Sequence, residues 1–319
     1  MNIYPWHQSN WDNLFADTER FPHGVILHGP CDSGINDFAS IISKKLICSK
    51  SNEAVCYCGS CQNCSWFDSQ SHPDFLPVNH SSLEEKKAII KVESIRELKD
   101  FFELSPHQRN GKKVSVIYDA HQMNRWASNA LLKILEEPPS DSVIILTTSN
   151  LSSLLPTIKS RSRLEAFSKP TFIEATNFLK SINKDDLRPF LQLYSGNPLA
   201  LISDHENHPL LIEIISSLKQ GKKFNLSVID GRWFSNGLLW LINVLQKWSY
   251  DILLFKLTNQ QYYFPNEELT INKLAKNSNT SSLLKFQKML IDVKLYATSP
   301  VNKEINIDII FINYRKIFI

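Results

Sequence analysis

The chain has 319 residues, a length that predicts two or three domains, each large enough to bury a core of its own. Hydrophobic residues make up 43% and charged residues 21%, which excludes a disordered, collagen-like or coiled-coil protein. The formal net charge of +3 is too small to indicate a dedicated nucleic-acid-binding protein, although it is compatible with a local basic surface.

Neither a targeting signal nor a membrane segment is expected. No basic segment followed by an apolar segment opens the chain, which favours a cytoplasmic protein. The most apolar stretch, residues 237–257, contains Lys247, Asp251 and Lys256, charges that a membrane-spanning helix would not tolerate. We interpret this stretch as a buried helix of a helical bundle.

Short β-rich segments alternate with helical patterns from Gly24 to about Phe167. Such alternation predicts an α/β fold in which a parallel sheet is flanked by helices. Residues 114–118 and 143–147 are almost continuously apolar or β-branched, which is typical of central strands covered on both faces. We expect these two strands to be neighbours in the sheet.

The strand signal disappears after Pro170, and short helical patterns follow. Ser195-Gly196-Asn197-Pro198 interrupts them, and a polar stretch at 203–209 precedes a Trp- and Leu-rich segment that continues to the C-terminus. We therefore predict three domains: an α/β domain at 1–166, a small helical domain at 167–206, and a helical bundle at 207–319.

The segment Leu27 to Asn36 has the context of a phosphate-binding loop, because it follows an apolar strand and opens a helix. Gly29 and Gly34 have the required spacing. A working loop needs a lysine for the phosphates and a hydroxyl for magnesium, but Ile35 and Asn36 occupy those positions. Asp32 adds a charge that repels phosphate. The segment is either a phosphate loop without its chemistry or simply a tight turn.

A second position bears on this choice. Asp119 ends the strand at 114–118, where an ATPase carries a magnesium-orienting aspartate followed by a glutamate that activates water. The next residue here is Ala120. A lone aspartate at a strand end is commonly a turn residue, so only the joint pattern indicates a nucleotide-binding fold without an active site.

Five of the six cysteines fall within residues 48–64. Cys58, Cys61 and Cys64 form two overlapping CxxC pairs, and with Cys48 they make a four-thiolate set typical of structural Zn²⁺. Cys56 is an alternative fourth ligand, and redox-active thiols are an alternative to the metal. Cys31, in the glycine loop, is expected to be an ordinary buried thiol.

Several further motifs occur in a fixed order: Tyr4-Pro5-Trp6, the cysteine cluster, His72-Pro73-Asp74, Asn129 to Lys133 running into Leu135 to Pro139, and Ser160-Arg161-Ser162. In that order they closely resemble the delta prime family of subunits of the bacterial DNA polymerase III clamp loader, in the AAA+ superfamily. The resemblance covers most of the chain. It implies an AAA+ module with an inserted zinc module at about 48–64, a small helical lid domain and a C-terminal collar domain.

The resemblance also implies a function. Five related subunits form an open ring that loads the sliding clamp onto primer-template DNA, and ATP lies at the interfaces between subunits. The expected partners are the gamma or tau motor subunits and delta in a hetero-oligomeric ring, as part of the polymerase holoenzyme. A chain with this phosphate loop is expected to bind no ATP in its own site and to act as a stator.

Arg161 matches the arginine that the family inserts into a neighbouring subunit's ATP site, where it stabilises charge on the transferred phosphoryl group. Ser162 replaces the family's cysteine, and Arg163 is a second nearby cation that could share the task. Leu199 occupies the position of an arginine that active relatives direct at their own nucleotide, which further supports an inactive site.

Two other functions remain as alternatives. A motor ATPase of the gamma or tau type would share the domain plan, but Ile35 argues against it. An unrelated zinc-stabilised nucleic-acid-binding protein would need a dense basic surface, whereas the basic residues are dispersed. Lys86-Lys87 and Lys112-Lys113 could contact a DNA backbone. About two of the three tryptophans at 233, 240 and 248 are expected in the core rather than at an interface.

Overall fold

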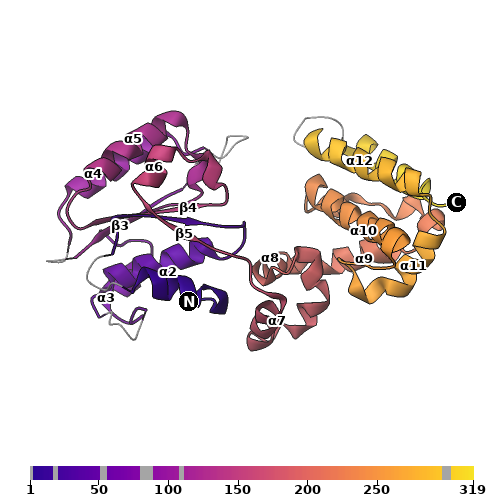
Figure 1. Cartoon of the computed structure of the whole chain (residues 1–319), viewed down its shortest axis with the longest axis horizontal. Coiled ribbons are helices and arrows are strands. Elements are labelled where there is room, and N and C mark those ends of the chain that lie inside the picture. The colour runs from indigo at the N-terminus through magenta and orange to yellow at the C-terminus, as the bar shows by residue number, and fades with distance from the viewer. Residues whose placement is uncertain (1–2, 17–20, 51–55, 80–88, 108–110, 297–302) are drawn as a thin grey trace. The chain divides into compact units, whose positions relative to one another are not determined.

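The computed structural model describes residues 3–16, 21–50, 56–79, 89–107, 111–296 and 303–319. Lys86 and Lys87 lie outside these residues. The chain divides into two compact units, Met1–Pro170 and Thr171–Ile319, which are drawn in Figure 1. This division is compatible with a boundary close to residue 166. The three-domain plan itself stays a prediction.

A five-stranded parallel sheet forms the centre of the first unit, as the sequence pattern predicts. Its strands are β1 (Gly24–His28), β2 (Phe75–Val78), β3 (Lys113–Ile117), β4 (Ser142–Thr148) and β5 (Arg163–Ala166), in the spatial order β2-β3-β4-β1-β5. The two continuous apolar segments are neighbours, with Val114 opposite Val143. Every residue of β3 and β4 is buried, which is why neither strand shows a polar alternation.

Helices cover both faces of this sheet. They are α1 (Gln8–Leu14), α2 (Ile35–Ile47), α3 (Gln62–Asp68), α4 (Val92–Glu103), α5 (Arg125–Glu136) and α6 (Pro156–Ser160). In Figure 1, α2 and α3 lie on one side of the sheet and α4, α5 and α6 on the other. Alternate strand residues divide between the two cores, since Val116 packs with α1 and α2 while Ile117 packs with α4 and α5.

The α5 helix shows how local sequence sets an element. The Asn124 side chain accepts a hydrogen bond from the Ala127 N–H and caps the helix, which ends at Glu136, before Pro138 and Pro139. Ala127, Leu131, Ile134 and Leu135 share its buried face. Glu136 is the last residue of α5 and contacts Arg161, which follows α6.

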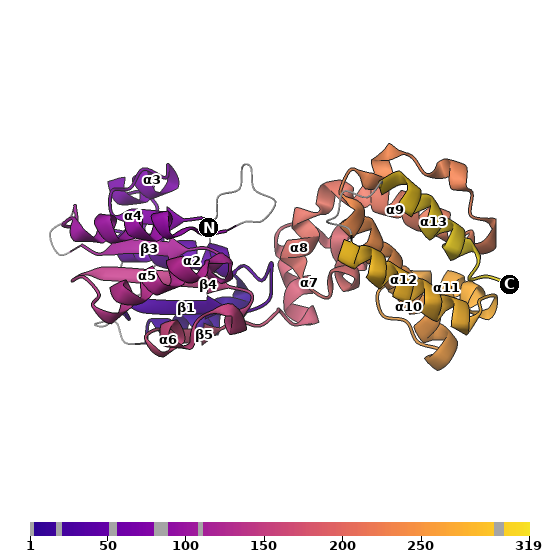
Figure 2. The ribbon, with the colours of Figure 1, turned by 90° about the horizontal axis from the view of Figure 1, so that it is seen from above.

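The second unit is helical, and its described residues form no strand longer than an isolated bridge. Its α-helices are α7 (Phe172–Ser181), α8 (Pro198–Ser203), α9 (His208–Leu218), α10 (Leu238–Thr258), α11 (Glu268–Lys276), α12 (Thr280–Tyr296) and α13 (Lys303–Arg315), and a 3-10 segment spans Asp185–Tyr194. Figure 2 shows α10, α12 and α13 side by side. A small core around Leu179 and Leu191 is distinct from a larger one around α10.

The apolar stretch at 237–257 forms α10, a buried helix as predicted. Trp233 and Trp248 are fully buried in the larger core, whereas Trp240 is partly exposed at its edge. The carboxylate of Asp251, also fully buried, accepts hydrogen bonds from the backbone N–H groups of residues 262–264 at 2.8–3.1 Å. These bonds explain how α10 carries a charge inside the bundle.

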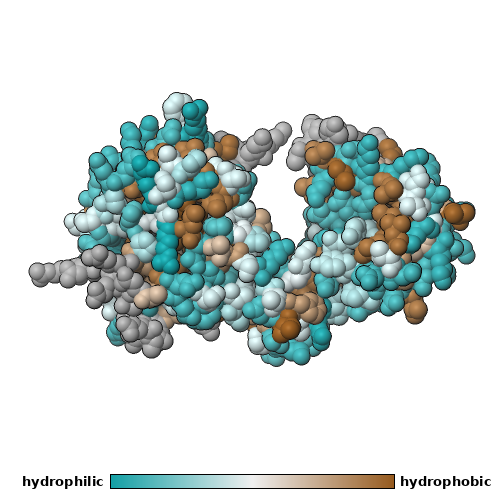
Figure 3. All heavy atoms as spheres, in the orientation of Figure 1, coloured by the Kyte–Doolittle hydropathy of each residue, from teal (hydrophilic) through white to brown (hydrophobic). Residues whose placement is uncertain are grey.

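Most of the described surface on the face drawn in Figure 3 is hydrophilic, and hydrophobic residues gather in smaller patches on both units. Such patches are ordinary on a folded surface. Within the described ranges, no helix combines the length and the apolar character needed to cross a membrane.

Candidate functional site

The loop between β1 and α2 has the backbone form that its two glycines predict. Gly34 has φ +86° and caps α2 in the left-handed region, which other residues adopt only with strain. A Cβ on Gly29 would lie 2.6 Å from the Phe167 carbonyl oxygen and 2.9 Å from its Cβ. Gly29 is therefore required by the close approach of Phe167, the residue that follows β5, whatever the loop binds.

Ile35 and Asn36, at the two positions where a working phosphate loop has a lysine and a hydroxyl, differ in environment. Ile35 is 7% exposed and packs with Trp11, Phe38 and Phe167 in the core between the sheet and helices α1 and α2, which we call the core below the sheet. Asn36 is exposed. Asp32 is exposed and has φ +57°. Cys31 is exposed, so the expectation of a buried thiol there is wrong; the residue lies in the surface turn before α2.

The N-terminal aromatic segment lies against this loop. The Tyr4 hydroxyl donates to Asp37 Oδ2 at 2.7 Å, and the Trp6 indole N–H donates to the Ser33 carbonyl at 3.3 Å. The two rings stack with centroids 5.0 Å apart. In the sequence these residues indicated only a family motif. Their contacts with the loop and with the first turn of α2 were not predicted.

His7 is buried next to this segment, and its ring makes edge contacts with Phe38 and Phe167. Burial lowers the pKa of His7 from 6.5 to about 4.

Between these two pKa values the unfolded chain binds a proton at His7 that the folded chain does not. The free energy of unfolding should therefore fall as pH falls through this window, by up to about 1.4 kcal/mol per pH unit. Urea unfolding of wild type and His7→Phe across this pH range measures the difference. Equal slopes for the two proteins would contradict the assignment.

Asp119 lies two residues after the end of β3 and has φ +50°, and its N–H donates to the Thr147 hydroxyl of β4 at 3.1 Å. Ala120 follows it and is buried. The Tyr118 hydroxyl contacts the Ser40 hydroxyl of α2 at 3.0 Å. The structure thus brings Asp119 to the same edge of the sheet as the β1–α2 loop, and a buried methyl group stands where a catalytic carboxylate would follow.

Arg161 follows α6 at the protein surface, with a side chain 37% exposed. Its Nη2 lies 2.8 Å from Glu136 Oε1 at the end of α5, and its Nη1 donates to the Thr157 carbonyl at 3.2 Å. Arg163 has other partners: its Nη2 donates to the Asn13 carbonyl at 2.8 Å and lies 3.9 Å from Glu165. The two arginines are therefore engaged in different surroundings.

Ser162 lies between them, and its hydroxyl oxygen is buried without a hydrogen-bond partner among the described residues. An unsatisfied buried hydroxyl destabilises a folded protein by roughly 1–3 kcal/mol. Ser162→Ala should therefore raise the free energy of unfolding by about 1 kcal/mol, because it removes the hydroxyl and leaves Arg161 in place. Denaturant unfolding of the two proteins measures this, and a clear loss of stability would contradict it.

Leu199 lies in the first turn of α8, in the second unit. The Asn197 side chain caps this helix by accepting from the Leu199 and Ala200 N–H groups at 3.0 and 3.4 Å. Pro198 and this cap account for the helix start. The position carries no charge.

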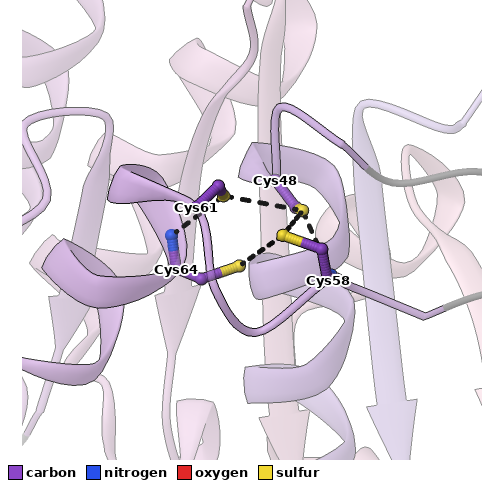
Figure 4. A group of neighbouring side chains, drawn as sticks. All are labelled: Cys48, Cys58, Cys61 and Cys64. Carbon is purple, nitrogen blue, oxygen red and sulfur yellow. Dashed lines mark hydrogen bonds between the residues drawn. The ribbon is translucent and has the colours of Figure 1, made fainter.

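Four cysteines come together beside α2, as Figure 4 shows. Cys48 follows the end of α2, whereas Cys58, Cys61 and Cys64 surround the start of α3. All four sulfur atoms lie within 4.8 Å of one another, and Cys48 Sγ is 3.6 Å from Cys58 Sγ and 3.9 Å from Cys61 Sγ. These separations exceed a disulfide bond, and the four thiols could hold a metal ion.

The fifth cysteine of this segment, Cys56, is not in the group and packs against the core below the sheet. Burial raises the pKa of the Cys56 thiol. Within the group, burial and a hydrogen bond that the Cys64 thiol donates to Cys61 raise the pKa of Cys64 to about 12. Burial opposes ionisation of Cys61 too, but hydrogen bonds from Ser49 and from the Cys64 N–H outweigh it and lower its pKa to about 6.

Polar contacts fix the cysteine segment to α2. The Lys44 ammonium lies 2.7 Å from both carboxylate oxygens of Asp68, at the end of α3. The Asn63 amide donates to the Ile47 carbonyl at 2.8 Å, and Lys44 also lies over the ring of Tyr57. The segment is thus anchored on the helix that begins at the glycine loop.

Comparison with known proteins gives one consistent family. The family model described as "DNA polymerase III, delta subunit" matches residues 9–171. A Pseudomonas aeruginosa protein named DNA polymerase III subunit delta' is 29% identical over 312 residues, which cover 94% of this chain and 93% of that protein. The Escherichia coli protein of the same name is 30% identical over 209 residues, or 64% and 61% of the two chains. A solved gamma subunit-related protein from Thermotoga maritima covers 97% of this chain and 98% of its own, with 17% identity and a TM-score of 0.44.

Proposed function

The chain belongs to the delta prime family of DNA polymerase III subunits, and we propose that it is a clamp-loader subunit that hydrolyses no ATP itself. The observation that carries this proposal is the β1–α2 loop. Ile35 is buried in the core where a lysine would have to reach phosphate, and Trp6 donates to the loop carbonyl of Ser33. A loop of this kind has neither the cation nor the magnesium ligand that hydrolysis requires.

Arg161 acts in trans in this proposal. An arginine that enters a neighbouring subunit's ATP site stabilises the negative charge that develops on the transferred phosphoryl group. The exposed position of Arg161 after α6 supports this role. The departure of Ser162 from the family's cysteine is small, because the guanidinium supplies the electrostatics.

The neighbouring subunits are motor subunits of the gamma or tau type and a delta subunit, assembled as a hetero-oligomeric ring in the cytoplasm. The ring loads the sliding clamp onto primer-template DNA, and the chain contributes as its stator. The helical bundle at 207–319 serves as the collar through which the subunits associate.

The four-cysteine group holds a structural Zn²⁺ in this proposal. With zinc–sulfur bonds near 2.3 Å, tetrahedral coordination places sulfur atoms about 3.8 Å apart. The contacts Cys48–Cys58, Cys48–Cys61 and Cys58–Cys64, at 3.6, 3.9 and 4.0 Å, are compatible with this spacing. The ion would cross-link the end of α2 to the start of α3. Four protein ligands leave no coordination position for a substrate, which favours a structural site.

Reconstitution tests the function. A clamp loader assembled from the cognate motor and delta subunits is compared with and without this chain for ATP hydrolysis stimulated by DNA and clamp. We expect full stimulation only with the chain present, and neither ATP hydrolysis nor ATP binding by the isolated chain. Hydrolysis by the isolated chain would instead support a gamma- or tau-type motor ATPase.

A further inference from the structure

Two carboxylates stand at the C-terminal end of α5, where helix electrostatics disfavours them. Glu136 is the last residue of the helix and Glu137 follows it. The C-terminus of a helix carries a partial negative charge, so an acidic residue there destabilises the helix. Local helix stability therefore does not explain Glu136.

The partner of Glu136 does not explain it through stability either. Glu136 Oε1 lies 2.8 Å from Arg161 Nη2, and the two side chains are 48% and 37% exposed. An ion pair as accessible as this contributes little to the stability of the fold. The ion pair matters instead because it fixes the position of the Arg161 guanidinium.

The guanidinium is held from two helices that pack side by side on one face of the sheet (Figure 1). From α6, the Thr157 carbonyl and the Ser160 hydroxyl oxygen accept from Nη1 at 3.2 and 3.4 Å. From α5, Glu136 accepts from Nη2. A free arginine side chain samples many rotamers, and such contacts remove this freedom before any partner is met.

We infer that Glu136 is a positioning residue for Arg161, which rests on the function proposed above. Glu136 binds the Nη2 edge of the Arg161 guanidinium and fixes the direction in which the group points. The guanidinium has five N–H donors, and the contacts from Thr157, Ser160 and Glu136 leave others available for phosphate oxygens. Because the ion pair is half exposed, the guanidinium can also shift toward a phosphate at little cost in folding energy.

Three variants in the reconstituted clamp loader test this inference. Glu136→Ala should lower the kcat of stimulated ATP hydrolysis about tenfold, since a misplaced catalytic group loses one to two orders of magnitude in rate. The KM for ATP should not change, because the motor subunit's own loop binds the nucleotide. Glu136→Gln keeps an acceptor oxygen and should restore most of the rate. Glu137→Ala is the matched control, with the same charge removed one residue away, and should behave as wild type.

A double-variant cycle separates positioning from a general structural effect. In an Arg161→Ala background, Glu136→Ala should cause no further loss of kcat, because the group that it positions is gone. An equal further loss in that background would overturn the inference. So would a faster Glu136→Ala enzyme, which would mean that the carboxylate competes with phosphate.

The same experiments distinguish failure of the inference from failure of the proposed function. If Arg161→Ala removes stimulated turnover while Glu136→Ala is unchanged, only the positioning role is wrong. If Arg161→Ala itself has no effect, the trans-acting arginine is wrong and the role of Glu136 falls with it. Thermal unfolding of each variant shows that the chain is folded in every comparison.

Discussion

Arg161→Ala is expected to lower DNA- and clamp-stimulated ATP hydrolysis by the reconstituted clamp loader about a thousandfold at the site that it serves. The guanidinium would meet negative charge that grows only in the transition state, so its loss should appear in kcat rather than in the KM for ATP. Single-turnover hydrolysis by the assembled complex measures this, with gel filtration to show that the variant still assembles. Folding should be nearly unaffected, because the half-exposed pair with Glu136 contributes little.

Arg163→Ala is the matched control for this prediction. Arg163 is not the residue that matches the family's arginine, and its guanidinium contacts the Asn13 carbonyl and Glu165 rather than Glu136, so turnover should stay close to wild type. A comparable loss in both variants would show that the two arginines share the function. Unchanged turnover in Arg161→Ala would leave the chain with a purely structural role in the ring.

The sheet was predictable from sequence because its central strands are buried on both faces. The segments at 114–118 and 143–147 are apolar without alternation, and this pattern has few explanations other than adjacent parallel strands. The structure confirms both the strands and their pairing. The spacing of Gly29 and Gly34 likewise indicated the backbone of the β1–α2 loop, since Gly34 supplies the left-handed cap of α2.

The surroundings of the site were not predictable, because they depend on contacts between distant residues. Tyr4 and Trp6 reach Asp37 and Ser33 across more than 25 positions of sequence, and no local periodicity marks such a contact. Glu136 and Arg161 are half exposed, so neither burial nor alternation distinguishes them from other surface charges. Only the helix that carries Glu136 was evident, and its charge pattern gave no reason to select one glutamate over the next.

The fourth cysteine shows the same limit. Cys48 and Cys56 both flank the CxxC pairs, and ligand spacing alone allows either. The end of α2 brings Cys48 to the other three sulfurs, while Cys56 packs against the core below the sheet. This difference allows a direct test of the proposed zinc site.

Removal of zinc by a strong chelator is expected to lower the stability of the first unit by several kcal/mol. Apparent binding free energies of structural zinc in small peptides are roughly 10–16 kcal/mol. The entropy cost of ordering the cysteine loop offsets part of this energy, and the remainder stabilises the folded state. Without the ion, the four cysteines lose the metal that they share. The α3 helix then keeps only polar contacts such as Lys44–Asp68 to hold it on α2. Elemental analysis should find one zinc per chain, and thermal unfolding with and without chelator measures the loss.

Cys48→Ser and Cys56→Ser form the matched pair for this prediction, because they make the same chemical change eight positions apart in one segment. Cys48→Ser should release the metal at far lower chelator concentration and lose stability, since a hydroxyl is a poor zinc ligand. Cys56→Ser should keep one zinc per chain, with only a small loss from its apolar contacts. The reverse order would make Cys56 the ligand, and a wild-type chain that binds no zinc would favour thiol redox chemistry instead. Because α2 joins the glycine loop to Cys48, hydrogen exchange in α2 after zinc removal would further show whether the loop depends on this anchor.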